Sequence, residues 1–457
     1  MPAETSLPPI QDTQPLNPLD AAIRCGDQSI RGMGYPGFET QMLVWLSGRL
    51  DAVRLKHALS RLALRRPVIT ARLREDEDCA PGRPYWAIQG TPAVLHEVQL
   101  PDAHPAAVNT FAAELLSKSH DLQMDVPLRF FLLRRPHGQD VFLMQYSHVL
   151  MDKFASVQVL REIDEIYRLD HKDEHEDNLA VPTEPRNVVH RWLMRLPRAD
   201  RRAASSAAIK LHGRVLRGRA AILGSGEEDK PRRVALQIAT RSLDPDCVRA
   251  LHERSAKVCG LPNLSMVILA SAFRAIDRLG PPERNADRNY VAGIGLDMKH
   301  RRQDRALLQN LVSVVPIFAR PAELADYDQL VRNLSGQIRE RLRDKVDWGV
   351  LRLANAFQRK PRHIRWVMEH LTRWTYSLWY AYFGSLDSIG DRFCGVPIGN
   401  AHYIGPTWSP MGLSLLVNQF QGPMCFQATY DPDLVGSEAG EAFLDLLLED
   451  LQEFAAG

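Results

Sequence analysis

One stretch constrains the fold of this chain more than any other, the run from Val141 to Leu169, VFLMQYSHVLMDKFASVQVLREIDEIYRL. It opens with an apolar run rich in β-forming residues, which predicts a buried strand. From Phe154 onward the apolar positions repeat with helical spacing and charged residues fill the other face, which predicts an amphipathic helix. His148 therefore follows the end of a buried strand, and the carboxylate of Asp152 comes four residues later.

This arrangement suits general base catalysis. A neutral imidazole held near an alcohol or an amine takes its proton as that group attacks an acyl carbon. The carboxylate of Asp152 then either fixes the loop or orients the ring of His148. The alternative is a buried polar pair at a strand-to-helix turn, since His-x-x-x-Asp alone is a weak pattern.

The sequence motifs in and around this stretch resemble those of the chloramphenicol acetyltransferase superfamily. Within it, the chain is most similar to condensation domains of nonribosomal peptide synthesis and to free-standing acyltransferases. Their signature is His-His-x-x-x-Asp-Gly at a strand-to-helix turn, and His148 and Asp152 match its second His and its Asp. Ser147 replaces the first His, and Lys153 replaces the Gly, a residue that normally permits a tight turn.

Further short motifs extend this resemblance over most of the chain. Leu46-Ser47-Gly48-Arg49-Leu50-Asp51 is similar to the opening strand and helix start of the family, and Asp51 is a suitable helix N-cap. Asn310 followed by Val314-Val315-Pro316-Ile317 resembles its second-lobe strand. The predicted hairpin around Gly422-Pro423 resembles the C-terminal motif of the family.

The resemblance implies an α/β fold with mixed sheets. Two chloramphenicol-acetyltransferase-like lobes would form a V, with an active-site channel at their interface and His148 at its centre. We expect a disordered tail over residues 1–18 and an N-terminal lobe with the HxxxD motif over residues 19–185. A basic linker segment over residues 186–230 and a C-terminal lobe over residues 231–457 would follow.

The resemblance also implies roles for individual residues. His148 would be the general base, and Asp152 would be structural, with Lys299 or Arg301 neutralising its charge. Ser385 or Ser388, at a strand end that faces the histidine in the family, would donate a hydrogen bond to the oxyanion. No metal is required.

The implied reaction moves an acyl group from a phosphopantetheine thioester on an acyl or peptidyl carrier protein to a hydroxyl or amine acceptor. Ester or amide formation in polyketide or nonribosomal peptide biosynthesis is the first prediction, with no tightly bound cofactor. Acyl transfer from coenzyme A is the second. In a third reading, Ser147 and Lys153 mark a catalytically silent domain that recruits a partner.

Two charged or aromatic segments allow several interpretations. The arginine-rich segment between Arg186 and Arg219 is a candidate docking surface for an acidic carrier protein, a contact for the phosphates of coenzyme A, or a solvated helix face. The aromatic and basic stretch from Trp348 to Tyr382 predicts core packing or the wall of an acyl tunnel.

Composition excludes several other classes. A net charge of +2 gives no global indication of nucleic-acid binding. We see no apolar run long enough to span a bilayer and no secretory signal, so we expect a cytoplasmic protein, and we expect it to be a monomer. The six cysteines lack CxxC spacing and indicate reduced thiols. The segment Asp170–Asp177 predicts a solvated polar linker rather than a metal site.

Overall fold

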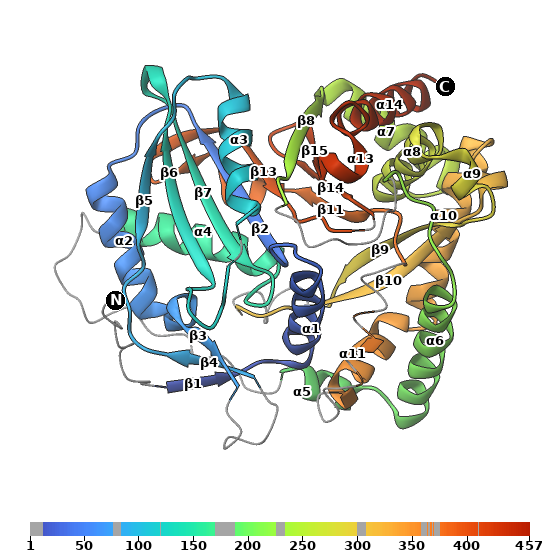
Figure 1. Cartoon of the computed structure of the whole chain (residues 1–457), viewed down its shortest axis with the longest axis horizontal. Helices are drawn as coiled ribbons and strands as arrows, with labels where there is room; N and C mark the ends of the chain where they lie inside the picture. The colour runs from blue at the N-terminus through green and yellow to red at the C-terminus, as the bar shows by residue number, and fades with distance from the viewer. Residues whose placement is uncertain are drawn as a thin grey trace.

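The computed structural model describes most of the chain and shows two lobes side by side, with α1 (Pro18–Gly32) between them (Figure 1). Each lobe is built on a mixed sheet with helices packed against it, as predicted. The described residues are 12–75, 84–118, 120–169, 188–224, 234–298, 308–357, 363, 366–367, 369, 375–409 and 411–457.

The N-terminal lobe contains a six-stranded sheet in the order β12-β13-β2-β7-β6-β5. All neighbours are antiparallel except β5 and β6, which run parallel. Its strands are β2 (Glu39–Leu46), β5 (Leu95–Gln99), β6 (Leu128–Arg134), β7 (Asp140–Ser147), β12 (Arg392–Phe393) and β13 (Val396–Ile404).

Strand β7 is buried along its whole length, because both faces of the sheet are covered. Phe142 and Met144 pack with α2 (Ala52–Arg65) and α4 (Lys153–Leu169). Val141 and Leu143 point to the opposite face and pack with α3 (Pro105–Leu116). A strand buried on both faces is a near-continuous apolar run in sequence, so the prediction for this segment is confirmed.

The C-terminal lobe contains a four-stranded sheet in the order β11-β14-β15-β8, with β11 and β14 parallel. The antiparallel pair of β9 and β10 lies beside it. The strands are β8 (Gln237–Leu243), β9 (Tyr290–Asp297), β10 (Val312–Ala319), β11 (Trp379–Ser385), β14 (Leu413–Gln419) and β15 (Met424–Tyr430).

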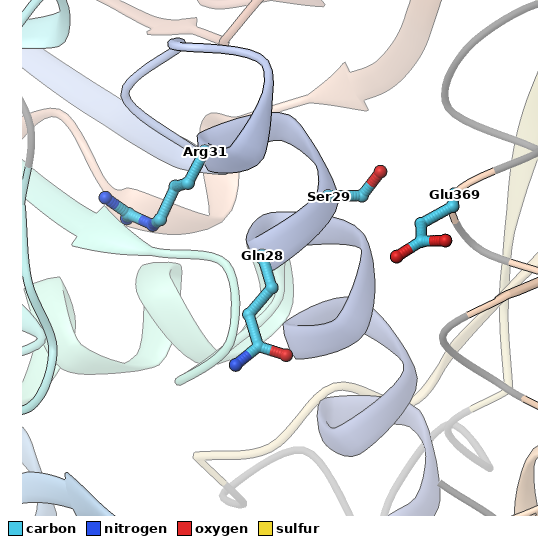
Figure 2. A pocket seen from close by; sticks show the side chains of 4 residues that line it. All are labelled: Gln28, Ser29, Arg31 and Glu369. Atoms are coloured by element: carbon cyan, nitrogen blue, oxygen red, sulfur yellow. The ribbon is translucent and has the colours of Figure 1, made fainter. Parts of the chain in front are cut away.

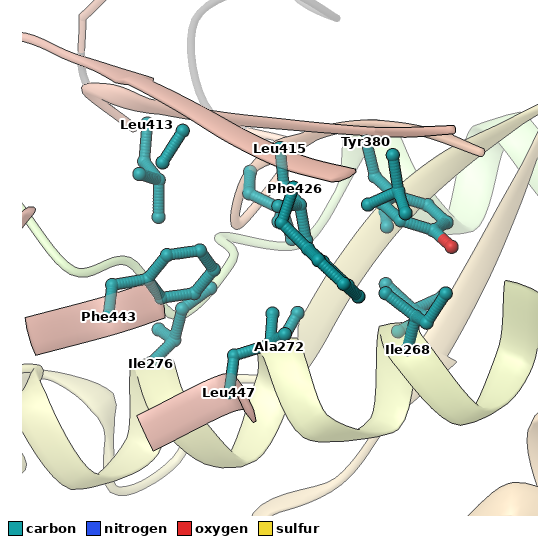
Figure 3. Packing of buried hydrophobic residues seen from close by; sticks show 14 of the residues in the cluster. Ile268, Ala272, Ile276, Tyr380, Leu413, Leu415, Phe426, Phe443 and Leu447 are labelled. Atoms are coloured by element: carbon teal, nitrogen blue, oxygen red, sulfur yellow. The ribbon is translucent and has the colours of Figure 1, made fainter. Parts of the chain in front are cut away.

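The core of this lobe is an apolar layer between its sheet and two helices (Figure 3). Helices α8 (Leu264–Leu279) and α14 (Ser437–Ala456) present their apolar faces to the strands. Phe426 and Phe443 in this layer are fully buried. Removing such apolar area from water is the main favourable contribution to folding.

The remaining elements complete the two lobes. Strands β1, β3 and β4 form a small antiparallel sheet in the order β1-β4-β3. The bounds are β1 (Asp12–Pro15), β3 (Arg72–Arg74), β4 (Tyr85–Ile88), α5 (Val188–Arg195), α6 (Arg198–Leu216), α7 (Pro245–Cys259), α9 (Pro282–Asn285), α10 (Tyr327–Arg343), α11 (Val346–Phe357) and α13 (Pro432–Val435).

The structure divides the chain differently from the predicted boundaries. Within the predicted tail, residues 12–15 form β1 and α1 begins at Pro18, while residues 1–11 lie outside the described part. The predicted linker contains α5 and α6, and α6 packs against α11 of the C-terminal lobe. Strands β12 and β13 come from residues 231–457 but complete the sheet of the N-terminal lobe, because β13 pairs with β2.

Within the described ranges, no single helix is long and apolar enough to cross a membrane. Among the helices that the structure describes, only α7 and α8 taken together reach the required length and composition, and they are bent by 93° relative to each other.

Candidate active site

The backbone of His148 is held by both lobes. Its N–H donates to the carbonyl oxygen of Phe38 at 2.8 Å, which extends the pairing of β7 with β2 by one residue. Its own carbonyl oxygen accepts from the side-chain Nδ2 of Asn310 at 2.7 Å. Asn310 is fully buried and lies just before β10, so the position of His148 depends on contact between the lobes.

The side chain of His148 lines a cavity of about 510 Å³. The residue is half-buried, and its Nδ1 is buried with no hydrogen-bond partner in the part of the chain that the structure describes. The volume is in the range of pockets that enclose a small-molecule ligand. The ring therefore reaches a space large enough for a substrate.

Asp152 fixes the loop. It is buried at the start of α4, and its Oδ1 accepts from the N–H of Ala155 at 3.0 Å, as an N-cap does. Its Oδ2 accepts from the N–H of Leu311 at 3.0 Å, in the segment that follows Asn310. These two bonds tie the turn to the helix and to the other lobe.

A second buried carboxylate, Asp20 of α1, belongs to the same network, and the sequence analysis missed it. Its Oδ1 accepts from the backbone N–H of Asn310 at 3.0 Å and from its Nδ2 at 2.8 Å. Burial raises the pKa of Asp20 to about 8, against hydrogen bonds from Asn310 and Asn17 that lower it. The capping box of Asn17 and Asp20 was the one sequence signal for this position.

The two departures from the family signature have local explanations. Ser147 is fully buried, and its Oγ accepts from the N–H of Val149 at 3.3 Å, within the turn. Lys153 is the first residue of α4, and its φ is not positive, so this position does not require glycine. The glycine of the signature is therefore unnecessary for the path of the backbone here.

The cavity lies between the lobes and is mainly apolar, as the predicted channel at the lobe interface would be. From the N-terminal side it is lined by α1, β2 and the turn of His148, and from the C-terminal side by α6, α8, β9, β10 and β11. Its aromatic lining consists of Phe38, Tyr146, Phe154, Tyr376, Trp379, Tyr380, Tyr382, Phe383 and Trp408.

Four of these aromatic residues confirm part of an earlier prediction. Tyr376, Trp379, Tyr380 and Tyr382 come from the aromatic stretch that was predicted to form core or a tunnel wall. A second histidine of the cavity, His212 of α6, was missed. Its Nδ1 lies 2.9 Å from the carbonyl oxygen of Ala208, and burial lowers its pKa.

The other predicted site residues lie elsewhere. Lys299 and Arg301 fall outside the described residues, so their pairing with Asp152 stays a prediction. Ser385 and Ser388 are exposed and do not line the cavity, and the Oγ of Ser385 accepts from the N–H of Asp387 at 2.9 Å. The segment 170–177 also lies outside the described part, and within the described residues no group of three or more His, Cys, Asp or Glu side chains is placed to hold a metal ion.

A second hollow of about 330 Å³ lies beside α1 (Figure 2). Gln28, Ser29 and Arg31 line it from the helix, and Glu369 lines it from across the gap. The guanidinium of Arg31 already pairs with Asp27 at 2.7 Å. This hollow lacks the His148 turn, so the cavity between the lobes is the candidate active site.

Comparison with known proteins agrees with this architecture. No family model and no curated protein matches the sequence. Among solved structures, the chain is similar to the first condensation domain of the CDA synthetase, with a TM-score of 0.72 and 16% identity over 98% of this chain and 97% of that one. It is also similar to the condensation domain of the monacolin K polyketide synthase MokA, with a TM-score of 0.67 and 16% identity over 98% of both chains.

A third similar structure is the starter condensation domain of the rhizomide synthetase RzmA, solved as a mutant in complex with C8-CoA. Its TM-score is 0.68, and it is 14% identical over 97% of this chain and 95% of that one. Near-complete coverage of both chains means that the whole architecture is shared, although few side chains are. The fold of this chain is the two-lobed chloramphenicol-acetyltransferase-like fold of condensation domains.

Proposed function

We propose that this protein is a condensation-type acyltransferase in which His148 is the general base. The observation that carries the proposal is the position of His148 on an apolar cavity between two lobes, in a turn held by Asp152 and Asn310. A positioned base of this kind contributes roughly 10² to 10⁴ in rate.

In the proposed reaction, a hydroxyl or amine acceptor attacks the carbonyl carbon of an acyl thioester. The imidazole of His148 accepts the proton of the attacking group, the new C–O or C–N bond forms, and the C–S bond breaks. The leaving thiolate then takes the proton from the imidazolium and departs as a thiol. The apolar lining excludes water, which would otherwise hydrolyse the thioester.

The thioester would be carried by the phosphopantetheine arm of an acyl or peptidyl carrier protein, and ester or amide formation in polyketide or nonribosomal peptide biosynthesis is the preferred context. Coenzyme A is the alternative donor, and the similar domain solved with C8-CoA favours testing it directly. Both lobes of one chain line the site, so we expect a monomer to be sufficient for the reaction. We also expect the protein to be cytoplasmic.

The test is intact-mass detection of acyl loss from a loaded carrier protein, with a panel of alcohols and amines. We expect His148→Ala to lower turnover by roughly 10²- to 10⁴-fold, without changing the melting temperature or carrier binding. His190→Ala, at an exposed position of α5, is the matched control and should keep wild-type turnover. The same acyl group offered on coenzyme A separates the two donors.

If wild-type protein binds carrier protein but never transfers the acyl group, the third reading holds. The protein would then be a silent recruiting domain, and His148→Ala would have no effect in any assay.

A further inference from the structure

Lys153 is the residue of the turn that the proposed mechanism does not use. It stands where the family signature has glycine, and its side chain lines the same cavity as His148. A lysine at the first position of a helix gains nothing from the helix dipole, which favours anions at that end. We therefore expect the ammonium group of Lys153 to interact with a partner other than the helix.

The contacts of the ammonium are incomplete. Its Nζ donates to the carbonyl oxygen of Phe383 on β11 and lies 5.0 Å from the ring centroid of Phe154 and 5.7 Å from that of Phe383. No ion pair within the described ranges includes Lys153. An ammonium group has three donors, so a carbonyl and two ring faces leave it only partly satisfied.

Two carboxylates act on this charge from nearby. Asp152 precedes Lys153, but both of its oxygens accept from backbone N–H groups. Asp297, at the end of β9, lines the cavity as well. Burial lowers the pKa of Lys153 to about 8, while Asp297 and Asp152 act in the opposite direction. These two carboxylates help to keep the ammonium charged at neutral pH.

A cation removed from water is costly unless an anion and hydrogen-bond acceptors replace the water. Here the replacement is partial, and Lys153 lines the same cavity as His148. We propose that Lys153 binds a carboxylate of the substrate, so that this site takes an acyl donor or an acceptor bearing a free carboxylate group. This inference uses the proposed function only to name the two substrate halves.

The test compares carboxylates with their carboxamides, which match them in size but lack the charge. The donor pair is the succinyl and succinamyl thioesters of N-acetylcysteamine, and the acceptor pair is 3-hydroxybutyrate and 3-hydroxybutyramide. Binding is measured by calorimetry on the full-length His148→Ala protein, with one ligand at a time, so that no acyl transfer occurs during the measurement. In one of the two pairs, the carboxylate should bind at least roughly tenfold more tightly than its carboxamide, as expected for a charge-assisted hydrogen bond.

Adding Lys153→Met to this protein should reduce the preference to within threefold, and adding Lys153→Arg should keep it. Lys153→Gln is a second neutral variant, in case the methionine variant folds poorly. Equal binding of both members of each pair, no carboxylate binding at millimolar concentration, or a preference that survives Lys153→Met would overturn the proposal. A preference that disappears with Lys153→Met while wild-type protein transfers no acyl group would refute only the proposed function.

Discussion

The start and the middle of helix α4 bury charge in opposite ways. In its middle, Glu162 is buried, and its two oxygens accept from Nη2 of Arg66 at 2.7 Å and Nε at 3.1 Å. Gln158 donates a further bond to Glu162 at 3.0 Å. At its start, the ammonium of Lys153 has one carbonyl acceptor and two aromatic rings.

The difference separates a structural charge from a functional one. The pair of Arg66 and Glu162 joins the end of α2 to α4 with a bidentate geometry that leaves little for a ligand to add. Lys153 faces a cavity and keeps donors open there. Sites that break the rule of full polar satisfaction are expected where a protein binds or reacts. The following predictions test this comparison.

The largest expected effect is on stability at the paired position, Glu162 in the middle of α4. Glu162→Ala leaves the guanidinium of Arg66 buried without its carboxylate, so the free energy of unfolding should fall by about 3–5 kcal/mol. Urea unfolding followed by circular dichroism measures it. Glu165→Ala, at a half-exposed position of the same helix, is the control and should change little. The comparison fails if Glu162→Ala is tolerated as well as Glu165→Ala.

Asp152→Asn should have the next largest effect. The amide keeps one acceptor but places an N–H₂ group against the N–H of either Ala155 or Leu311, so the free energy of unfolding should fall by about 1–3 kcal/mol. Acyl transfer should fall as well, because the turn that carries His148 loses one of the two bonds by which Asp152 holds it to α4 and to the other lobe. A variant that is destabilised but fully active would show that this tie does not position His148.

Asp20→Asn should change how stability depends on pH. Burial raises the pKa of Asp20 from 3.8 to about 8, so between these values the folded state keeps a proton that the unfolded state releases. Stability from this group is therefore complete below pH 3.8 and is lost as pH rises, by up to ~1.4 kcal/mol per unit. Between pH 6 and 8 the wild type should lose stability relative to Asp20→Asn, which urea unfolding at each pH measures; parallel curves would contradict this.

The smallest expected effect on stability is that of Lys153→Met. Methionine fills a similar volume without a buried charge, so the free energy of unfolding should change by less than about 1 kcal/mol. Destabilisation as large as that of Glu162→Ala would show that Lys153 mainly ties α4 to β11. The two charged positions of α4 would then be alike, and the contrast between them would be lost.

A pH profile sharpens the same contrast. As pH rises through about 8, the ammonium of Lys153 loses its proton, despite the opposing carboxylates of Asp152 and Asp297. The KM for a carboxylate substrate should therefore rise above that pH, whereas the KM for its carboxamide should not. Since His148 is common to both substrates, the ratio of the two KM values isolates Lys153. A ratio that stays constant from pH 7 to 9.5 would contradict the assignment.

Local patterns in the sequence were enough to predict much of the fold. Asp51 caps α2 as expected, because a cap depends on residues only two or three positions away. The hairpin of β14 and β15 was predicted for the same reason.

Contacts between distant segments were beyond such patterns. The predicted linker became α5 and α6, because its scattered apolar residues needed α11 to pack against. Strand β13 joined the other lobe, because pairing with β2 satisfies backbone groups on an otherwise open sheet edge.

The sequence by itself determined the strand, turn and helix that carry His148, since apolar period and helix capping act over a few residues. Only the tertiary structure decided what surrounds them. The bond from Asn310 to Asp20 spans 290 residues, and Leu311 reaches Asp152 from the other lobe. Buried polar groups must find partners wherever folding places them, and no local pattern records which distant group that will be.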